Sequence, residues 1–190
     1  MSAASVLDEG LAEVARRLRE RSPLPTLLLP KPWTPWDPAI HARLTGGDLA
    51  AADPGLRAGL LLWNDALAEA HTLSQGLAGP DGAYWHAIMH RREGDLDNAG
   101  YWFGRVGAHP VFVGLHPVAT GIASAAGHAG NTWAAALRRE WTEAGAWDPL
   151  RFLALCADVR EAPGPHPVLE RIQVAEIELL LRHCGGGRAA

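Results

Sequence analysis

The sequence predicts an all-α protein: a compact array of about seven to eight helices with a central helical hairpin and an extended proline-rich arm. Apolar residues recur at helical spacing through most of the chain. Breaks rich in glycine, proline and aspartate separate these stretches. β-branched runs are nearly absent, and the longest, residues 111–113, is too short to build a sheet. With 190 residues, of which 48% are hydrophobic and 20% charged, the chain is expected to form a single domain, 1–190, with a substantial core.

The first two segments differ sharply in proline content. Residues 1–22 are expected to form an amphipathic helix. Its apolar face comprises Leu7, Leu11, Val14 and Leu18. Residues 23–38 hold six prolines together with Trp33 and Trp36, a composition that favours an extended course. We expect this arm to lie across the domain surface, held by the two indoles. The alternative is an arm that crosses to a second subunit and so forms a homodimer.

The rest of the chain is expected to be a helical core, 39–184, followed by a loose tail, 185–190. Candidate helices cover 55–77, 82–93, 96–107, 117–126, 131–144, 149–161 and 167–183. Asp81, Asn131 and Asp148 stand where each could cap the helix that follows. The segments 82–93 and 96–107 resemble one hairpin of a tetratricopeptide-type repeat. Because no array follows, the resemblance implies hairpin packing and not a peptide-binding solenoid.

Charge and cysteine content exclude several classes of protein. The formal net charge of −4 argues against nucleic acid or an anionic membrane as the main partner. Cys156 and Cys184 cannot make a disulfide framework, and neither has metal-ligand spacing. No segment is typical of a targeting signal, and no uninterrupted apolar run approaches the ~18 residues of a membrane span. We therefore expect a cytoplasmic protein with no nucleic-acid or membrane partner.

Two histidines one helical turn apart give the sharpest chemical signal. His86, His90 and Glu93 fall within roughly 60° of one another around a helix. Imidazoles at this spacing can share a divalent metal such as Zn, Fe or Mn. Further ligands would come from His71, His109 or Glu69. We predict His86, His90 and His109 as metal ligands, with Glu93 and His71 as catalytic residues. The alternative is that the histidines fill a hydrogen-bonded layer between helices.

Polar residues on neighbouring helices extend this prediction to a pocket. In the expected helix 55–77, Asn64, His71 and Gln75 would form one stripe, and Asn98, Tyr101 and Arg105 share a face of 96–107. If these helices converge, they line a pocket for a small polar ligand. The predicted ligand-binding residues are Asn64, Gln75, Asn98, Tyr101 and Arg105. The alternative is a hydrated seam between helices.

Two further features bear on the same region. His109 and His116 each precede a proline, which disfavours helical geometry, so both are expected on bends at the ends of elements. Arg91 and Arg92 could hold an anionic ligand, but we expect them on the solvated rim of the hairpin.

The middle of the chain carries a specific string of residues. Its parts are Tyr84-Trp-His-x-x-x-His-Arg-x-Glu-x-Asp, then Asn98-Ala-x-Tyr-Trp and Gly107-x-His-Pro, with His71-x-x-Ser-Gln upstream. This string resembles the signature of a family of uncharacterised bacterial proteins. The resemblance implies that these residues belong to one unit, and it brings no activity with it.

Three hypotheses of function follow. The first is a helical protein whose central pocket binds a divalent metal or a small polar ligand and hydrolyses a substrate. The second is a non-catalytic, helical-repeat-like interaction module that uses the hairpin groove or the arm. The third is a metal-free enzyme acting on a small anionic substrate. Loss of ligand binding on His86→Ala with the fold intact would favour the first.

Overall fold

The computed structural model describes residues 3–161 and 166–186, and within these ranges every regular element is a helix. The ten helices are α1 (Ala3–Arg19), α2 (Pro38–Thr45), α3 (Pro54–Trp63), α4 (Leu67–Gln75), α5 (Gly79–Glu93), α6 (Leu96–Val106), α7 (Pro110–His128), α8 (Thr132–Ala144), α9 (Pro149–Glu161) and α10 (Pro167–Gly186). The predicted all-α class is confirmed, and the number of helices exceeds the seven to eight predicted.

One extra helix comes from a corner inside the expected helix 55–77. The chain leaves α3 at Asn64, and Asp65 adopts a left-handed conformation with φ of 64° before α4 begins. No glycine or proline stands at this corner. The helical spacing of apolar residues therefore continues across it and does not reveal the break. The other extra helix, α2, begins where the arm ends, with Pro38 in its first turn and the Asp37 carboxylate accepting hydrogen bonds from two backbone N–H groups.

Helix α7 starts at Pro110 and runs through Pro117, so the expected bend at His116 is wrong. Proline cannot donate to the carbonyl of Val113, but Val113 and Pro117 both lie on the exposed face, where water can hydrate that carbonyl. The bend expected at His109 is confirmed, because His109 is the N-cap of α7 with extended backbone. The tail also begins later than predicted: Gly185 and Gly186 belong to α10, and residues 187–190 lie outside the described ranges.

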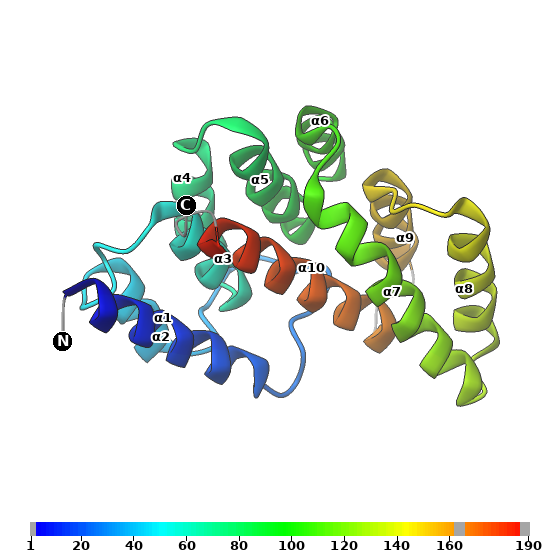
Figure 1. The fold of residues 1–190 in the computed structure, drawn as a ribbon, viewed down its shortest axis with the longest axis horizontal. Helices are drawn as coiled ribbons and strands as arrows, with labels where there is room; N and C mark the ends of the chain where they lie inside the picture. Colours follow the sequence, from blue (N-terminus) through cyan, green and yellow to red (C-terminus); the bar gives the residue numbers. More distant parts are fainter. Residues whose placement is uncertain (1–2, 162–165, 187–190) are drawn as a thin grey trace.

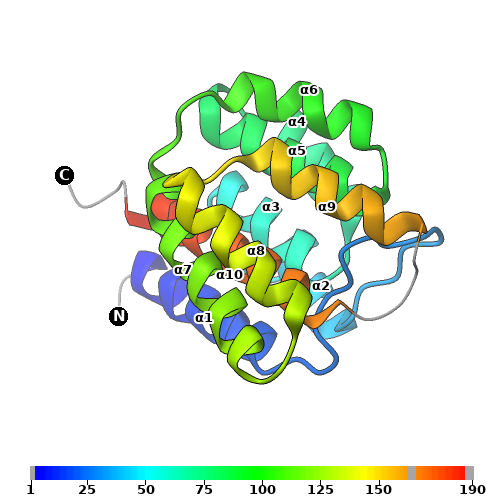
Figure 2. The same ribbon diagram turned by 90° about the vertical axis from the view of Figure 1, so that its right-hand side faces the viewer.

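Two clusters of buried apolar side chains form the core, and α10 contributes to both. Its second half places Ile177 and Leu180 in the larger cluster, with α1 to α6. Its first half places Leu169 and Ile172 in the smaller one, with α7, α8 and α9. Figure 1 shows α10 passing through the middle of the molecule, with α7 and α8 on one side and α1 to α3 on the other. Figure 2 shows α4, α5 and α6 together along one edge.

Helix α5 is the most deeply buried element. Its residues from Gly82 to Arg92 are all buried. Trp85 packs against α3 at Gly59, where a Cβ atom would stand 2.5 Å from the indole. The short connection to α6 turns at Gly94, which adopts a left-handed φ of 87°. Because residues 82–92 of α5 are buried, their polar side chains are expected to find partners inside the protein.

Arg91 and Arg92 find such partners and are fully buried, so the predicted solvated rim is wrong. Arg91 donates to Glu176 on α10 at 2.6 Å, and Tyr84 donates to the same carboxylate at 2.9 Å. Arg92 donates to Asp65 at 2.7 Å. Burial would raise the pKa of Asp65, but the two guanidinium groups of Arg92 and Arg21 outweigh it and hold that pKa below its usual value. These pairs tie α5 to α10 and to the corner between α3 and α4.

The proline-rich arm lies against the same chain. The N–H of Leu29 donates to the carbonyl of Arg92 at 2.6 Å, and Gln173 on α10 donates to the carbonyl of Thr26 at 3.1 Å. Trp36 packs on the larger core cluster, and the indole of Trp33 donates to the carbonyl of Leu29 at 3.0 Å. The arm therefore contacts its own domain, as expected. Nothing bears on a homodimer, which stays a prediction.

Among the described residues, one helix, α7, is long and apolar enough by length and composition to cross a membrane. It carries His116, Thr120 and Ser124 along its length. One side packs on α8 and α10, where Leu115 and Ala119 are buried.

Candidate functional site

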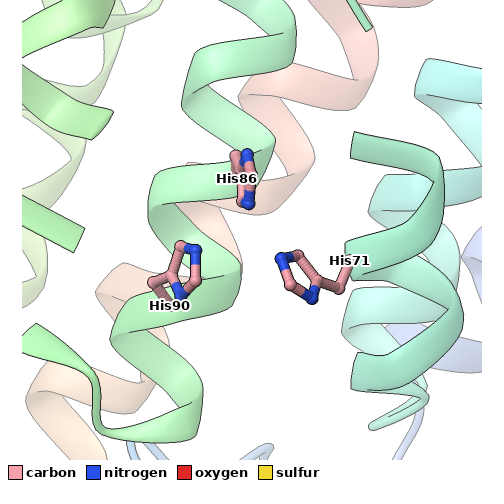
Figure 3. Close-up of side chains that lie close together, drawn as sticks. All are labelled: His71, His86 and His90. Atoms are coloured by element: carbon pink, nitrogen blue, oxygen red, sulfur yellow. The ribbon is translucent and has the colours of Figure 1, made fainter. Parts of the chain in front are cut away.

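Three histidines from two helices meet at one point beside α5. His86 and His90 project from α5, and His71 projects toward them from α4 (Figure 3). The ring centroid of His71 lies 4.9 Å from that of His86 and 5.1 Å from that of His90. One ligating nitrogen from each ring lies within 4.8 Å of the others. The predicted pair is therefore joined by His71, and we call these residues the three-histidine cluster.

Helical spacing and an aromatic neighbour orient the cluster. His86 and His90 are four residues apart, so their rings stack with centroids 4.7 Å apart. The indole of Trp102, on α6, stacks on His86 at 4.1 Å. His86 and His90 are buried, whereas His71 is half-buried. The cluster is thus enclosed on the α5 and α6 sides and reaches solvent beside α4.

The hydrogen bonds of His90 and His71 decide which ring nitrogens can bind a metal. His90 bonds to Glu93 through Nδ1, 2.6 Å from a carboxylate oxygen. A carboxylate only accepts, so Nδ1 carries a proton, and the neutral form of the ring keeps its lone pair on Nε2. The amide nitrogen of Gln75 lies 2.9 Å from Nε2 of His71 and can only donate, so the lone pair of that nitrogen accepts from Gln75, and a metal bound there would replace this hydrogen bond.

His86 has no hydrogen-bond partner at either ring nitrogen, although its side chain is buried. An unpaired polar group in a protein interior costs about 1–3 kcal/mol, so its position needs a reason. Burial, followed by the nearby His90 and His71, lowers the pKa of His86 to about 4. Burial and His90 likewise lower the pKa of His71. Both rings are therefore neutral at pH 7 and can act as ligands.

The structure separates His109 from this cluster. His109 bonds through Nε2 to Asp81 at 2.8 Å, and its Nδ1 accepts from the N–H of Val111 at 3.2 Å. Both ring nitrogens of His109 are thus engaged by partners outside the three-histidine cluster. Asp81 also lies 3.3 Å from His183 and sits inside the first turn of α5. The expected N-cap role of Asp81 is accordingly wrong, because the helix begins two residues earlier.

Two other predicted residues also lie elsewhere. Asn64 closes the corner after α3, where its side chain accepts from the N–H of Asp37 and donates to the carbonyl of Asp37, both at 2.9 Å. The expected stripe with His71 fails because the helix ends between them. Glu69 pairs with His41 at 2.9 Å, beside a cavity of about 580 Å³ next to the arm.

The remaining predicted residues lie on the outer side of α6. Asn98 donates to Asp95, the N-cap of α6, at 2.7 Å. Tyr101 and Arg105 are exposed, with the guanidinium over the rings of Tyr101 and Trp102. Trp102, on the same helix, is the residue of α6 that stacks on His86 of the cluster. Its place three residues before Arg105, on the edge between the apolar and polar faces, was the signal for this contact.

The three-histidine cluster makes acid sensitivity of the metal-free protein predictable. The pKa of His86 is lower in the folded state, about 4, than the usual 6.5 of an unfolded chain. The folded state is therefore destabilised as the pH falls from 6.5 toward 4, by about 3 kcal/mol, because the unfolded chain takes up the proton on His86 more readily than the folded chain. Urea unfolding in chelator should show this loss in the native chain relative to His86→Leu. Parallel stability profiles from pH 7 to pH 4 would contradict it.

No known protein family, no curated protein and no solved structure matches this chain. The resemblance to a bacterial family accordingly stays a prediction, and the site has to be interpreted from its own geometry.

Proposed function

We propose that this protein binds one divalent transition-metal ion through His71, His86 and His90 and uses it to hydrolyse a small substrate. Three histidine ligands with at least one further position for water are a typical ligand set for catalytic zinc. A bound metal supplies a Lewis acid and lowers the pKa of a coordinated water toward neutrality. This proposal changes three predicted roles: His71 becomes a ligand in place of His109, and Glu93 becomes the carboxylate that orients His90.

The observation that carries the proposal is the unpaired, buried imidazole of His86. A layer of structural histidines would be expected to satisfy its members by hydrogen bonds, as Asp81 and the N–H of Val111 do for His109. In the cluster, by contrast, His86 has both nitrogens free and the rings of His71 and His90 beside it. A metal would satisfy the buried nitrogen that nothing else in the described structure reaches.

The neighbours of the cluster suit a metal centre. Metal-bound histidines usually donate their other N–H to a carboxylate or carbonyl, which fixes the ring. Glu93 provides such a partner to His90 at 2.6 Å. Ligand nitrogens around tetrahedral zinc lie roughly 3.3 Å apart, given bonds of ~2.0–2.1 Å. The separations of up to 4.8 Å here leave room for the rings to turn inward around an ion.

Elemental analysis of the untagged protein, purified without chelator and titrated with Zn²⁺ or Co²⁺, tests this proposal. We expect one metal ion per chain in the native protein. Because each imidazole is a direct ligand, His86→Gln and His71→Ala should weaken metal binding at least about 100-fold, which is the upper end of the effect of replacing a group that only supports a ligand. His71 is half-buried, so its replacement leaves the fold intact even if His86→Gln does not.

His128→Ala, at the exposed end of α7, is the matched control and should keep the metal. Far-UV circular dichroism reports whether each variant is folded. Hydrolysis of 4-nitrophenyl acetate should require the metal, stop on chelation and return when Zn²⁺ is added. A folded native chain that binds neither Zn²⁺ nor Co²⁺ would overturn the proposal and favour a metal-free pocket or an interaction module. Metal binding without any metal-dependent hydrolysis would overturn only its catalytic half.

A further inference from the structure

The geometry points to a substrate class for this site: we propose that Arg105 binds an oxyanion group of the substrate, a carboxylate or a phosphate, beside the three-histidine cluster. This inference rests on the proposed metal centre. It assigns the exposed guanidinium on α6 as a specificity-determining group rather than as ordinary surface charge.

Arg105 differs from most arginines of the protein in lacking an acidic partner. Arg43 pairs with Asp48, and Arg151 pairs with Glu140, although both are on the surface. Within the described ranges Arg105 forms no ion pair. Its contacts are the hydroxyl of Tyr101, at 3.5 Å, and the faces of two rings of its own helix. Its charge is therefore available to a ligand.

The same indole contacts both Arg105 and the cluster. The guanidinium carbon lies 5.6 Å from the ring centroid of Trp102, and His86 stacks on that indole at 4.1 Å. Trp102 and Arg105 are three residues apart on α6, so helical geometry keeps them on one side. Trp102 therefore lies against both the cluster and the guanidinium, so a substrate that binds at the cluster and extends past this indole would meet Arg105.

The chemistry of these groups selects an anion. A guanidinium presents a planar set of N–H donors that matches the two oxygens of a carboxylate or phosphate. The phenol of Tyr101, 58% exposed, adds another donor beside it. Two carboxylates lie near the cluster but form no contact with Arg105: Glu93 accepts from Nδ1 of His90, and Asp95 accepts from Asn98. They therefore leave the positive charge on α6 unopposed by a direct contact.

Anion binding to the Co²⁺-loaded protein tests this inference, with inorganic phosphate and acetate as the probes. Binding is followed through the visible absorption of the bound Co²⁺. Loss of one charge-assisted, two-oxygen contact should weaken the binding of at least one probe about tenfold in Arg105→Gln. Arg105→Lys, which keeps the charge but not the planar set of N–H donors, should show only part of that loss. Arg139→Gln, an exposed arginine on α8, makes the same change in net charge and should have no effect.

The outcomes separate the two proposals. Weaker phosphate or acetate binding in Arg105→Gln but not in Arg139→Gln, with Co²⁺ content unchanged, supports the inference. The probe that binds more tightly to the native chain identifies the oxyanion. Equal binding in the native chain, Arg105→Gln and Arg139→Gln overturns it while the metal centre stands. Failure of both probes to bind the Co²⁺-loaded native chain overturns it as well. Failure of both Co²⁺ and Zn²⁺ to bind overturns the proposed function first, and this inference with it.

Discussion

Replacing Arg91 with methionine is expected to lower the free energy of unfolding by about 3–5 kcal/mol, because it leaves the buried charge of Glu176 uncompensated. Neither side chain of this pair has measurable exposure to solvent. The carboxylate would keep only the hydroxyl of Tyr84, which donates to it at 2.9 Å. Urea unfolding at pH 7, followed by circular dichroism, measures the effect. The size of the loss makes a folding defect visible at 37 °C.

A double replacement distinguishes the cost of a broken pair from the value of an intact one. Arg91→Met with Glu176→Leu removes both charges together, and buried pairs replaced by apolar residues of similar volume are often neutral. We therefore expect the double variant to recover most of the lost stability. Arg105→Gln, on the surface, should change stability by less than about 0.5 kcal/mol. If Arg91→Met had an equally small effect, the pair would not be buried as described.

The predicted rim position of Arg91 and Arg92 failed for a reason that applies to every buried ion pair. Composition and periodicity describe a residue by its neighbours in the chain, whereas Glu176 follows Arg91 by 85 residues. Two consecutive arginines near a helix end are usually solvated, since a charge rarely enters a core unpaired. Only the tertiary structure, which brings α10 against α5, supplies the partner.

Local geometry, in contrast, predicted the half of the site that lies on one helix. The spacing of His86 and His90 places their rings on the same face, and they stack in the structure. The His109-Pro110 step predicted a bend, and His109 is indeed an N-cap. Which histidine completes the cluster depends on the path between α3 and α4. From the sequence, either His71 or His109 could join His86 and His90. Tertiary contacts bring His71 to the cluster and pair His109 with Asp81.

The two faces of α5 explain how a polar cluster can be held rigidly. One face carries the histidines toward α4 and α6, and the other carries two arginines whose ion pairs fix the helix to its surroundings. A site mounted on a helix with locked neighbours keeps its geometry more accurately than one on a loop. The buried charges thus serve the cluster indirectly, by fixing the position of α5 relative to the corner that directs α4.

Replacing Asp65 with alanine is expected to have the largest effect of all on that corner. It removes the carboxylate that pairs with Arg92 at 2.7 Å and with Arg21 at 2.8 Å, leaving two buried guanidinium groups without their acid. We expect a loss of about 3–5 kcal/mol from the charges. A further loss of about 1 kcal/mol should come from placing alanine at a left-handed φ of 64°. Thermal and urea unfolding measure the sum.

Asp65→Asn separates the two causes, because asparagine tolerates the left-handed conformation and keeps the shape of the side chain but not its charge. Its loss should equal the charge contribution alone, and Asp65→Gly should resemble the alanine variant without the strain. Since Asp65 sets where α4 begins, and α4 carries His71, variants that remain folded should also bind Co²⁺ more weakly in the order of their instability. Unchanged Co²⁺ affinity in a folded but destabilised Asp65→Asn would show that His71 is placed by its contacts within the cluster and not by the corner.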